Sequence, residues 1–189
     1  MKRFGTTALA LLLCLSASAC ASPKLNVLDP VEPRTDAPGV TISRKAHPIK
    51  LPLESLAGAT FIGSHGELIL YNKHKGLFAT VVTSDDWGNP SIQMNEVPSY
   101  IFNRDLSAIQ TPELRKELEG VIRMTLEPAK EKESSVVTMG EITAYIAFNP
   151  MKTMIMLTSP DKPDLFTQLV LDNFSWEEIE HEILKGIGG

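Results

Sequence analysis

GEITAYIAFNPMKTMIMLTS, residues 140–159, contains two apolar runs separated by a turn signal. The first run, 142–148, alternates with a period of two, which is typical of a β-strand. Asn-Pro-Met-Lys at 149–152 interrupts the pattern, and 153–158 is again apolar and rich in strand formers. Because both faces of the two runs are apolar, we predict a hairpin of 142–148 and 152–157 at the centre of an antiparallel sheet covered on both sides.

Short runs rich in β-branched and aromatic residues precede this hairpin, and glycine-containing turns divide them. We expect strands at 59–62, 67–71, 77–83 and 92–97. Thr111 and Pro112 provide an N-cap and a proline at the first helical position, and Leu114, Leu118 and Ile122 form an apolar stripe, which together predict a helix over 112–125.

Two more helices are expected after the hairpin. One begins within 161–164, and its inner face would carry Leu165, Phe166, Leu169 and Val170. The other begins with the capping box formed by Ser175 and Glu178 and ends at Gly186. We expect it to bury Trp176, Ile179, Ile183 and Leu184.

This order of elements predicts an α/β (α+β) fold, an antiparallel sheet flanked by helices in one domain over 59–189. The helix after Thr111-Pro112, the run from Tyr145 to Ser159 and the segment Asp172-Asn173-Phe174 together resemble the Mog1/PsbP-like family over about residues 59–175. The resemblance implies an α/β/α sandwich and a non-enzymatic binding or assembly role, as in the photosystem-associated lumenal proteins and bacterial lipoproteins of that family. It carries over no catalytic residue, and the helix after Ser175 departs from its pattern.

Composition narrows the class of protein. The 189 residues are 43% hydrophobic and 22% charged, with a formal net charge of −5, which fits one ordinary globular domain. Without Lys2 and Arg3 the chain holds 16 basic and 23 acidic residues, a net charge of −7. An acidic chain is a poor partner for nucleic acid, whose phosphates require a clustered basic surface.

The first twenty residues have the parts of a secretory signal. Lys2 and Arg3 precede an apolar core at 8–15, and Ala17-Ser18-Ala19 is a small-residue exit. The apolar core spans about 12 Å as a helix, too short to cross a hydrocarbon layer of about 30 Å. We therefore expect residues 1–19 to be a signal peptide.

Cys20 follows the small residues directly, and the chain has only one other cysteine, Cys14. Small residues before a cysteine resemble the lipobox of bacterial lipoproteins, although Ala17 stands where that motif usually has leucine. The resemblance implies a diacylglyceryl group on Cys20, and Ala21 after it favours the outer membrane facing the periplasm. The alternative is an ordinary signal peptide, because Ala17-x-Ala19 and Ala19-x-Ala21 also fit signal peptidase I.

The segment 20–58 holds six of the thirteen prolines, which favours an extended tether between the lipid and the domain. The alternative is that 40–42 and 49–53 add short edge strands. No cysteine lies beyond Cys20, so residues 59–189 contain no disulfide, thiol nucleophile or cysteine-based metal site.

The candidate chemical motifs are weak. Gly63-Ser64-His65-Gly66 lacks the glycine two residues before the serine that a nucleophile elbow requires, so we interpret it as a turn. The four histidines have no metal-ligand spacing, and we expect all of them at the surface: His47, His65, His74 and His181.

Three further clusters have a structural and a functional interpretation. Met151, Met154 and Met156 suit Cu(I), but core packing is the favoured interpretation. Asp85, Asp86 and Asn89 form a loop capped by its own side chains, or a cation site. The acidic residues of the last helix are expected on its exposed face: Glu177, Glu178, Glu180 and Glu182.

The sequence thus predicts a lipid-anchored cell-envelope protein that acts as a non-enzymatic binding or assembly module, with the membrane and an envelope protein as partners. We assign it no catalytic, cofactor or metal residue. Two alternatives remain: a periplasmic hydrolase with an unrecognised site, which requires a deep pocket with shifted pKa values, and a methionine-based copper protein, which requires accessible methionines. A binding module instead requires an apolar groove or an open edge strand.

Overall fold

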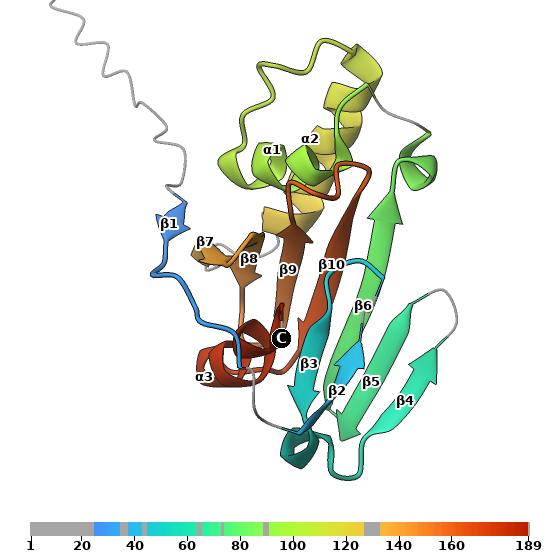
Figure 1. Ribbon diagram of the computed structural model, residues 1–189. Coiled ribbons are helices and arrows are strands. Elements are labelled where there is room, and N and C mark those ends of the chain that lie inside the picture. Colours follow the sequence, from blue (N-terminus) through green and yellow to red (C-terminus); the bar gives the residue numbers. More distant parts are fainter. Residues whose placement is uncertain are drawn as a thin grey trace, which may run out of the picture.

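The computed structural model describes residues 25–34, 38–42, 45–63, 66–72, 74–88, 91–126 and 133–188. Its core is an eight-stranded sheet with helices near both ends of its strands (Figure 1). The strands, in their order across the sheet, are β1 (Asn26–Val27), β7 (Glu133–Met139), β8 (Ile142–Phe148), β9 (Lys152–Thr158), β10 (Leu165–Asp172), β6 (Lys75–Thr83), β5 (Glu67–Asn72) and β4 (Thr60–Gly63).

The predicted central hairpin is confirmed as β8 and β9, which pair antiparallel in the middle of the sheet. Asn149 makes the turn between them, because its side chain accepts a hydrogen bond from the amide of Met151 at 2.9 Å. Ile146 is fully buried on one face of the hairpin, and Met156 is 2% exposed on the other. Both faces are therefore covered, as the apolar pattern predicted.

Neighbouring strands extend the hairpin on both sides. β7 pairs antiparallel with β8, and the turn between them uses Gly140 with a φ of 60°, a value that glycine adopts without strain. On the other side, β10 connects β9 to the meander of β6, β5 and β4. Among the strands that the structure describes, only β1 is parallel to its neighbour, β7. The predicted strands 59–62, 67–71 and 77–83 correspond to β4, β5 and β6.

Two helices cover part of one sheet face, which we call the helix side. They are α1 (Val97–Asn103), preceded by the 3-10 turn η3 (Met94–Glu96), and α2 (Pro112–Leu126), which matches the predicted helix 112–125. Their buried residues pack with Ala147, Met156 and Phe166 of the sheet. The helical residues of this core are Met94, Val97, Ile101, Phe102, Leu114, Leu118, Ile122 and Leu126.

The opposite face, the hairpin side, is covered by a small hairpin and the C-terminal helical segment. The hairpin pairs β2 (Gly39–Ile42) with β3 (Ile49–Pro52), and η1 (Leu53–Leu56) follows it. The helical segment consists of α3 (Trp176–Glu178), the π-helix η4 (Ile179–Ile183) and the 3-10 helix η5 (Leu184–Gly186). The capping box of Ser175 and Glu178 is present, and Ile179, Ile183 and Leu184 are buried as predicted, whereas Trp176 is half-buried.

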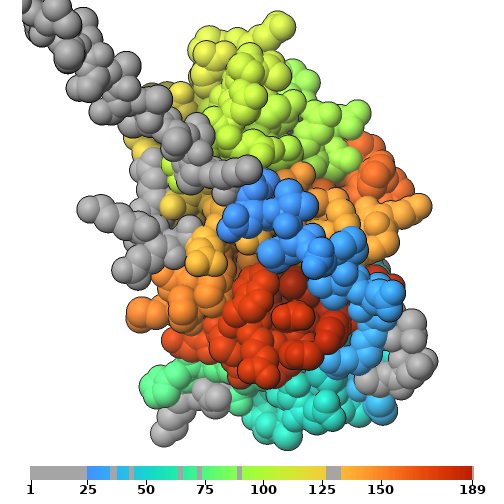
Figure 2. Space-filling model, turned by 90° about the vertical axis from the view of Figure 1, so that its left-hand side faces the viewer, coloured from blue at the N-terminus to red at the C-terminus, as the bar shows by residue number. Residues whose placement is uncertain are grey.

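The predicted tether 20–58 is wrong from residue 25 onward. Leu28 and Val31 donate backbone hydrogen bonds to β7, and Figure 2 shows this N-terminal segment lying across the surface beside the C-terminal helical segment. Ile49 and Leu51 of β3 are fully buried in the core. The alternative expectation of strands near 40–42 and 49–53 is therefore confirmed, although β2 and β3 form a separate two-stranded sheet. Residues 20–24 lie outside the described residues.

Two local predictions also differ from the structure. The segment expected to form a helix with Leu165, Phe166, Leu169 and Val170 on its inner face is strand β10. Its apolar residues fit a helical and a strand period equally, and pairing with both β6 and β9 makes it a strand. The expected strand 92–97 is η3 and the start of α1.

Candidate functional site

The helices cover only part of the helix side of the sheet. The strand register identifies which side chains lie on the uncovered part. A row of paired residues crosses six strands on this face: Ala147, Met154, Val170, Phe78, Leu68 and Ile62. Ala147 is fully buried, whereas Phe78 is 40% and Ile62 is 50% exposed. The side chains of the row are therefore apolar throughout, but the helices do not cover those at Phe78 and Ile62.

We call Val170, Phe78, Leu68, Leu70 and Ile62 the outer apolar face. Leu70 is 40% exposed in the next row, and the ring of Phe78 lies over Gly66, where an added Cβ would come within 2.7 Å of it. Burial of large apolar side chains is favourable by about 1.5–3 kcal/mol each, so a contiguous exposed set marks a contact surface. Three of the exposed large apolar side chains of the described sheet belong to the outer apolar face: Ile62, Leu70 and Phe78.

The outer apolar face ends at β4, whose far side pairs with no strand of the described chain. All four residues of β4 are exposed, and Phe61 points to the hairpin side with 49% of its surface exposed. β4 contains neither a charge nor a proline, the residues that usually protect an edge strand from pairing. At the other end of the sheet, β1 covers the edge of β7. The two-residue strand β1 thus covers part of β7 at that end, whereas no described strand covers β4.

A hollow of about 370 Å³ adjoins the outer apolar face. It lies between Leu70 and the exposed side chain of Met151, which is 75% exposed. The rest of its wall is polar and comes from His74, Lys75, Gly76, Asp172 and Asn173. The surface around β4 and β5 thus combines an open edge, an apolar face and a recess.

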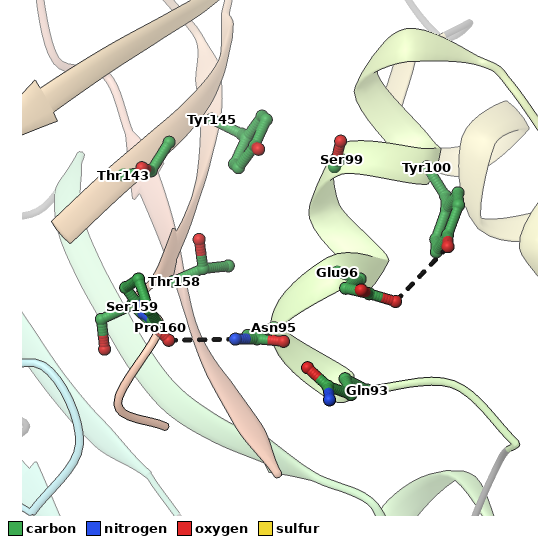
Figure 3. A pocket seen from close by; sticks show the side chains of 10 residues that line it. All are labelled: Gln93, Asn95, Glu96, Ser99, Tyr100, Thr143, Tyr145, Thr158, Ser159 and Pro160. Carbon is green, nitrogen blue, oxygen red and sulfur yellow. Dashed lines mark hydrogen bonds between the residues drawn. The ribbon is translucent and has the colours of Figure 1, made fainter. Parts of the chain in front are cut away.

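A second opening, which we call the hydroxyl pocket, lies between α1 and the ends of β8 and β9 (Figure 3). Its volume is about 360 Å³. Ten residues line it: Gln93, Asn95, Glu96, Ser99, Tyr100, Thr143, Tyr145, Thr158, Ser159 and Pro160. Beside α1 the paired residues on this face of the sheet are polar, because Thr143 of β8 pairs with Thr158 of β9.

Hydrogen bonds fix the helix side of the hydroxyl pocket. The amide nitrogen of the Asn95 side chain donates to the carbonyl oxygen of Ser159 at 3.1 Å. The hydroxyl of Tyr100 donates to the carboxylate of Glu96 at 3.4 Å. Burial, together with the charge of Glu96, raises the pKa of Tyr100. Tyr100 therefore stays neutral over the physiological range.

His47 lies beneath this region on the hairpin side, fully buried, so the prediction that it is a surface residue is wrong. Its Nδ1 lies 2.8 Å from the hydroxyl of Thr167, and its Nε2 lies 3.1 Å from the hydroxyl of Ser159. The Ser159 side chain thus points away from the hydroxyl pocket (Figure 3). Burial and, secondarily, the positive charge of Lys162 lower the pKa of His47 to about 4.

These contacts form one chain of polar groups. The side chain of Ser159 and, secondarily, that of Lys162 lower the pKa of Asp161. Each ring nitrogen of His47 lies within hydrogen-bond distance of one hydroxyl, and the tautomer decides which partner donates. Because His47 and Thr167 are fully buried and Ser159 is 4% exposed, these polar groups form part of the core.

The other residues singled out from the sequence lie apart from one another. Ser64, His65 and Asn89 are outside the described residues, and His74 and His181 are exposed as predicted. Met156 is buried under the helices while Met151 is exposed, so the accessible triad that copper binding requires does not exist. Within the described ranges, no group of three or more histidine, cysteine, aspartate or glutamate residues is placed to hold a metal ion.

The acidic clusters are structural. Asp86 accepts hydrogen bonds from the amide and hydroxyl of Thr83, which lower its pKa and confirm the self-capped loop. Glu178 accepts from Lys75 at 2.9 Å. Glu182 differs from the prediction of an exposed face, because its Oε2 is buried without a hydrogen-bond partner among the described residues.

Comparison with family models, with curated proteins and with solved structures found no match to this chain. No helix in the described part of the chain is long and apolar enough to cross a membrane.

Proposed function

We propose that this protein is a lipid-anchored component of the bacterial cell envelope that acts as a non-enzymatic binding or assembly module. The observation that carries the proposal is the open edge of β4 together with the outer apolar face. The partner we propose is an envelope protein that adds an extended strand to β4.

The contrast between the two uncovered parts of the helix side supports a partner there. Near the hydroxyl pocket the sheet carries the polar pair of Thr143, which is half-buried, and Thr158, which is buried. Near β4 it places Phe78, Leu70 and Ile62, which water solvates poorly. The helix side of the sheet is thus polar near the hydroxyl pocket and apolar near β4. The apolar part is therefore suited to contact with a partner protein.

Strand addition fits the edge geometrically. β4 offers unpaired backbone groups, and an added strand would continue the row that runs through Phe78, Leu68 and Ile62. Backbone hydrogen bonds would supply affinity, and the hollow beside Leu70 and Met151 would accept a side chain of the partner. In this arrangement the protein binds its partner and catalyses no reaction.

Lipid attachment at Cys20 rests on the sequence, where the cysteine follows Ala17-Ser18-Ala19. Two or more acyl chains give a stable anchor, whereas one gives only marginal membrane binding. Mass spectrometry of the mature N-terminus tests this part: a lipid-modified Cys20 supports it, and a free thiol or a chain that begins at Ser22 contradicts it.

Site-specific crosslinking tests the docking surface in native envelopes. A photoreactive phenylalanine analogue is placed at Phe61, and a control is placed at Met124, which is 70% exposed on α2. We expect one discrete protein adduct from position 61 that is absent from position 124. Combining the analogue at 61 with Ile62→Lys should abolish the adduct, because lysine on an edge strand opposes strand addition.

The control for this experiment is the fold of the Ile62→Lys variant, measured by urea unfolding. Ile62 is half exposed on an edge strand, so the variant should unfold close to the wild type. Equal adducts at positions 61 and 124, or an adduct that Ile62→Lys leaves unchanged in a folded protein, would contradict docking at β4.

A further inference from the structure

We infer that the hydroxyl pocket is a binding site for a neutral, hydroxyl-rich ligand of the size of one sugar ring. This site is separate from the β4 surface, and the inference does not depend on lipid attachment or on strand addition. It follows from the groups that the pocket presents and from how they are held.

The two walls of the pocket present complementary groups. The strand side contributes Tyr145 and Thr158, and the helix side contributes Ser99 of α1 and Glu96 of η3, whose carboxylate accepts a hydrogen bond from Tyr100 (Figure 3). The Ser99 oxygen accepts a hydrogen bond from the side-chain amide of Asn103 at 3.1 Å, which leaves its own proton to donate. Donors and acceptors therefore lie on both sides, as vicinal hydroxyls of a ligand require.

The groups are fixed before a ligand arrives. The Tyr145 ring packs against Phe102 with ring centroids 5.6 Å apart, and Thr158 is held by pairing with Thr143. Asn95 links η3 to the end of β9 through its bond to Ser159. Fixed polar groups lose little conformational entropy on binding, which favours a specific ligand over adventitious solvent.

The charge of the lining restricts the ligand class. Among the ten lining residues Glu96 is the only charged one, so an anion would meet a carboxylate with no compensating cation. A wholly apolar ligand would strip water from the hydroxyls without replacing their hydrogen bonds. The volume of about 360 Å³ is at the lower end for small-molecule sites, which fits a single ring.

NMR titration of the full-length protein tests the inference, in a detergent whose head group contains no sugar. The probes are glucose and N-acetylglucosamine, with inorganic phosphate and ethanolamine as charged comparators. We expect saturable shifts of the Ser99 and Thr158 amides with one or both sugars, with a Kd on the order of 1–10 mM. The charged comparators should give weaker shifts.

Three variants locate the site. Tyr145→Phe removes a hydroxyl but keeps the ring against Phe102, and Ser99→Ala removes the donor; each should raise the Kd about three- to tenfold. Tyr71→Phe is the matched control, because it removes a tyrosine hydroxyl outside the pocket, and it should leave the Kd unchanged.

Absence of saturable shifts with both sugars up to about 50 mM would overturn the inference. Tighter binding of phosphate or ethanolamine at the same amides would overturn the ligand class. If sugars bind equally well to the wild type, Tyr145→Phe and Ser99→Ala, the site lies elsewhere.

Discussion

The imidazole Nε2 of His47 lies 3.1 Å from the hydroxyl oxygen of Ser159, so a polar contact fastens the loop between β2 and β3 to the end of β9. The two residues are 112 positions apart in sequence, and both are buried. Thr167 satisfies the other ring nitrogen. A neutral imidazole is therefore part of the core, and its protonation would place a charge there.

Stability should fall as pH decreases from about 6.5 to about 4.5 because of His47. The pKa of His47 is about 4 in the folded protein and 6.5 when the side chain is exposed. As pH falls, His47 is therefore protonated in the unfolded chain before it is protonated in the folded protein, and the free energy of unfolding decreases through this range. The negative charge of Asp161 opposes the shift and the positive charge of Lys162 reinforces it. Urea unfolding should show a loss of about 2–3 kcal/mol between pH 7 and 4.5.

The control for this prediction is His47→Gln, which keeps hydrogen-bonding capacity but does not titrate. It should be less stable than the wild type at pH 7 and nearly independent of pH between 7 and 5. The carboxylates with lowered pKa values, such as Asp86 and Asp161, lose their contribution only at lower pH. An unchanged pH dependence in His47→Gln would show that another group is responsible.

Ile146→Asp should destabilise the protein by about 3 kcal/mol or more in urea titration. Ile146 is fully buried in the central hairpin, and a carboxylate there has no partner. Ile62→Asp is the matched control: the same substitution on the exposed edge strand should cost less than about 1 kcal/mol. If the two variants unfold alike, the assignment of β8 to the core is wrong.

The same substitution should have opposite effects at two glycines. Gly120→Ala lies inside α2 with open space around the added Cβ, so higher helix propensity should stabilise the protein by about 0.5–1 kcal/mol. Gly186→Ala would press its Cβ against the backbone carbonyl of Lys50 in β3, which cannot move freely. Thermal unfolding should therefore rise for Gly120→Ala and fall for Gly186→Ala, and the same sign in both would contradict the packing of η5 on β3.

The central hairpin was predictable because its information is local. The turn residues at 149–152 and the apolar character of both faces are properties of one short stretch, and the helix over 112–125 likewise carries its own cap and stripe. β10 was not predictable, because Leu165, Phe166, Leu169 and Val170 satisfy a helical and a strand period equally. Pairing with β6 and β9 decided it.

The surfaces that matter for function depended on tertiary structure. Exposure of Phe78 and Ile62 follows from where α1 and α2 end, which no local pattern encodes. The burial of His47 likewise depends on partners more than 100 residues away. Proline content misassigned residues 25–58, because Pro52 is tolerated at the end of β3, which pairs with β2 in a two-stranded sheet.

Cys20→Ser should move the protein out of the detergent phase while leaving its fold unchanged. The only cysteines are Cys14 and Cys20, so the substitution removes no disulfide from the described domain. Four residues separate Cys20 from Leu25, where the described chain begins, and the five Cα–Cα steps between them span at most about 18 Å, so a lipid on Cys20 would hold the domain close to the membrane. Phase partitioning and urea unfolding measure the two effects separately: partitioning should change completely, and the midpoint in urea should stay the same. A Cys20→Ser variant that remains in the detergent phase would exclude the cysteine as the anchor, whereas an aqueous wild-type protein would exclude lipid attachment altogether.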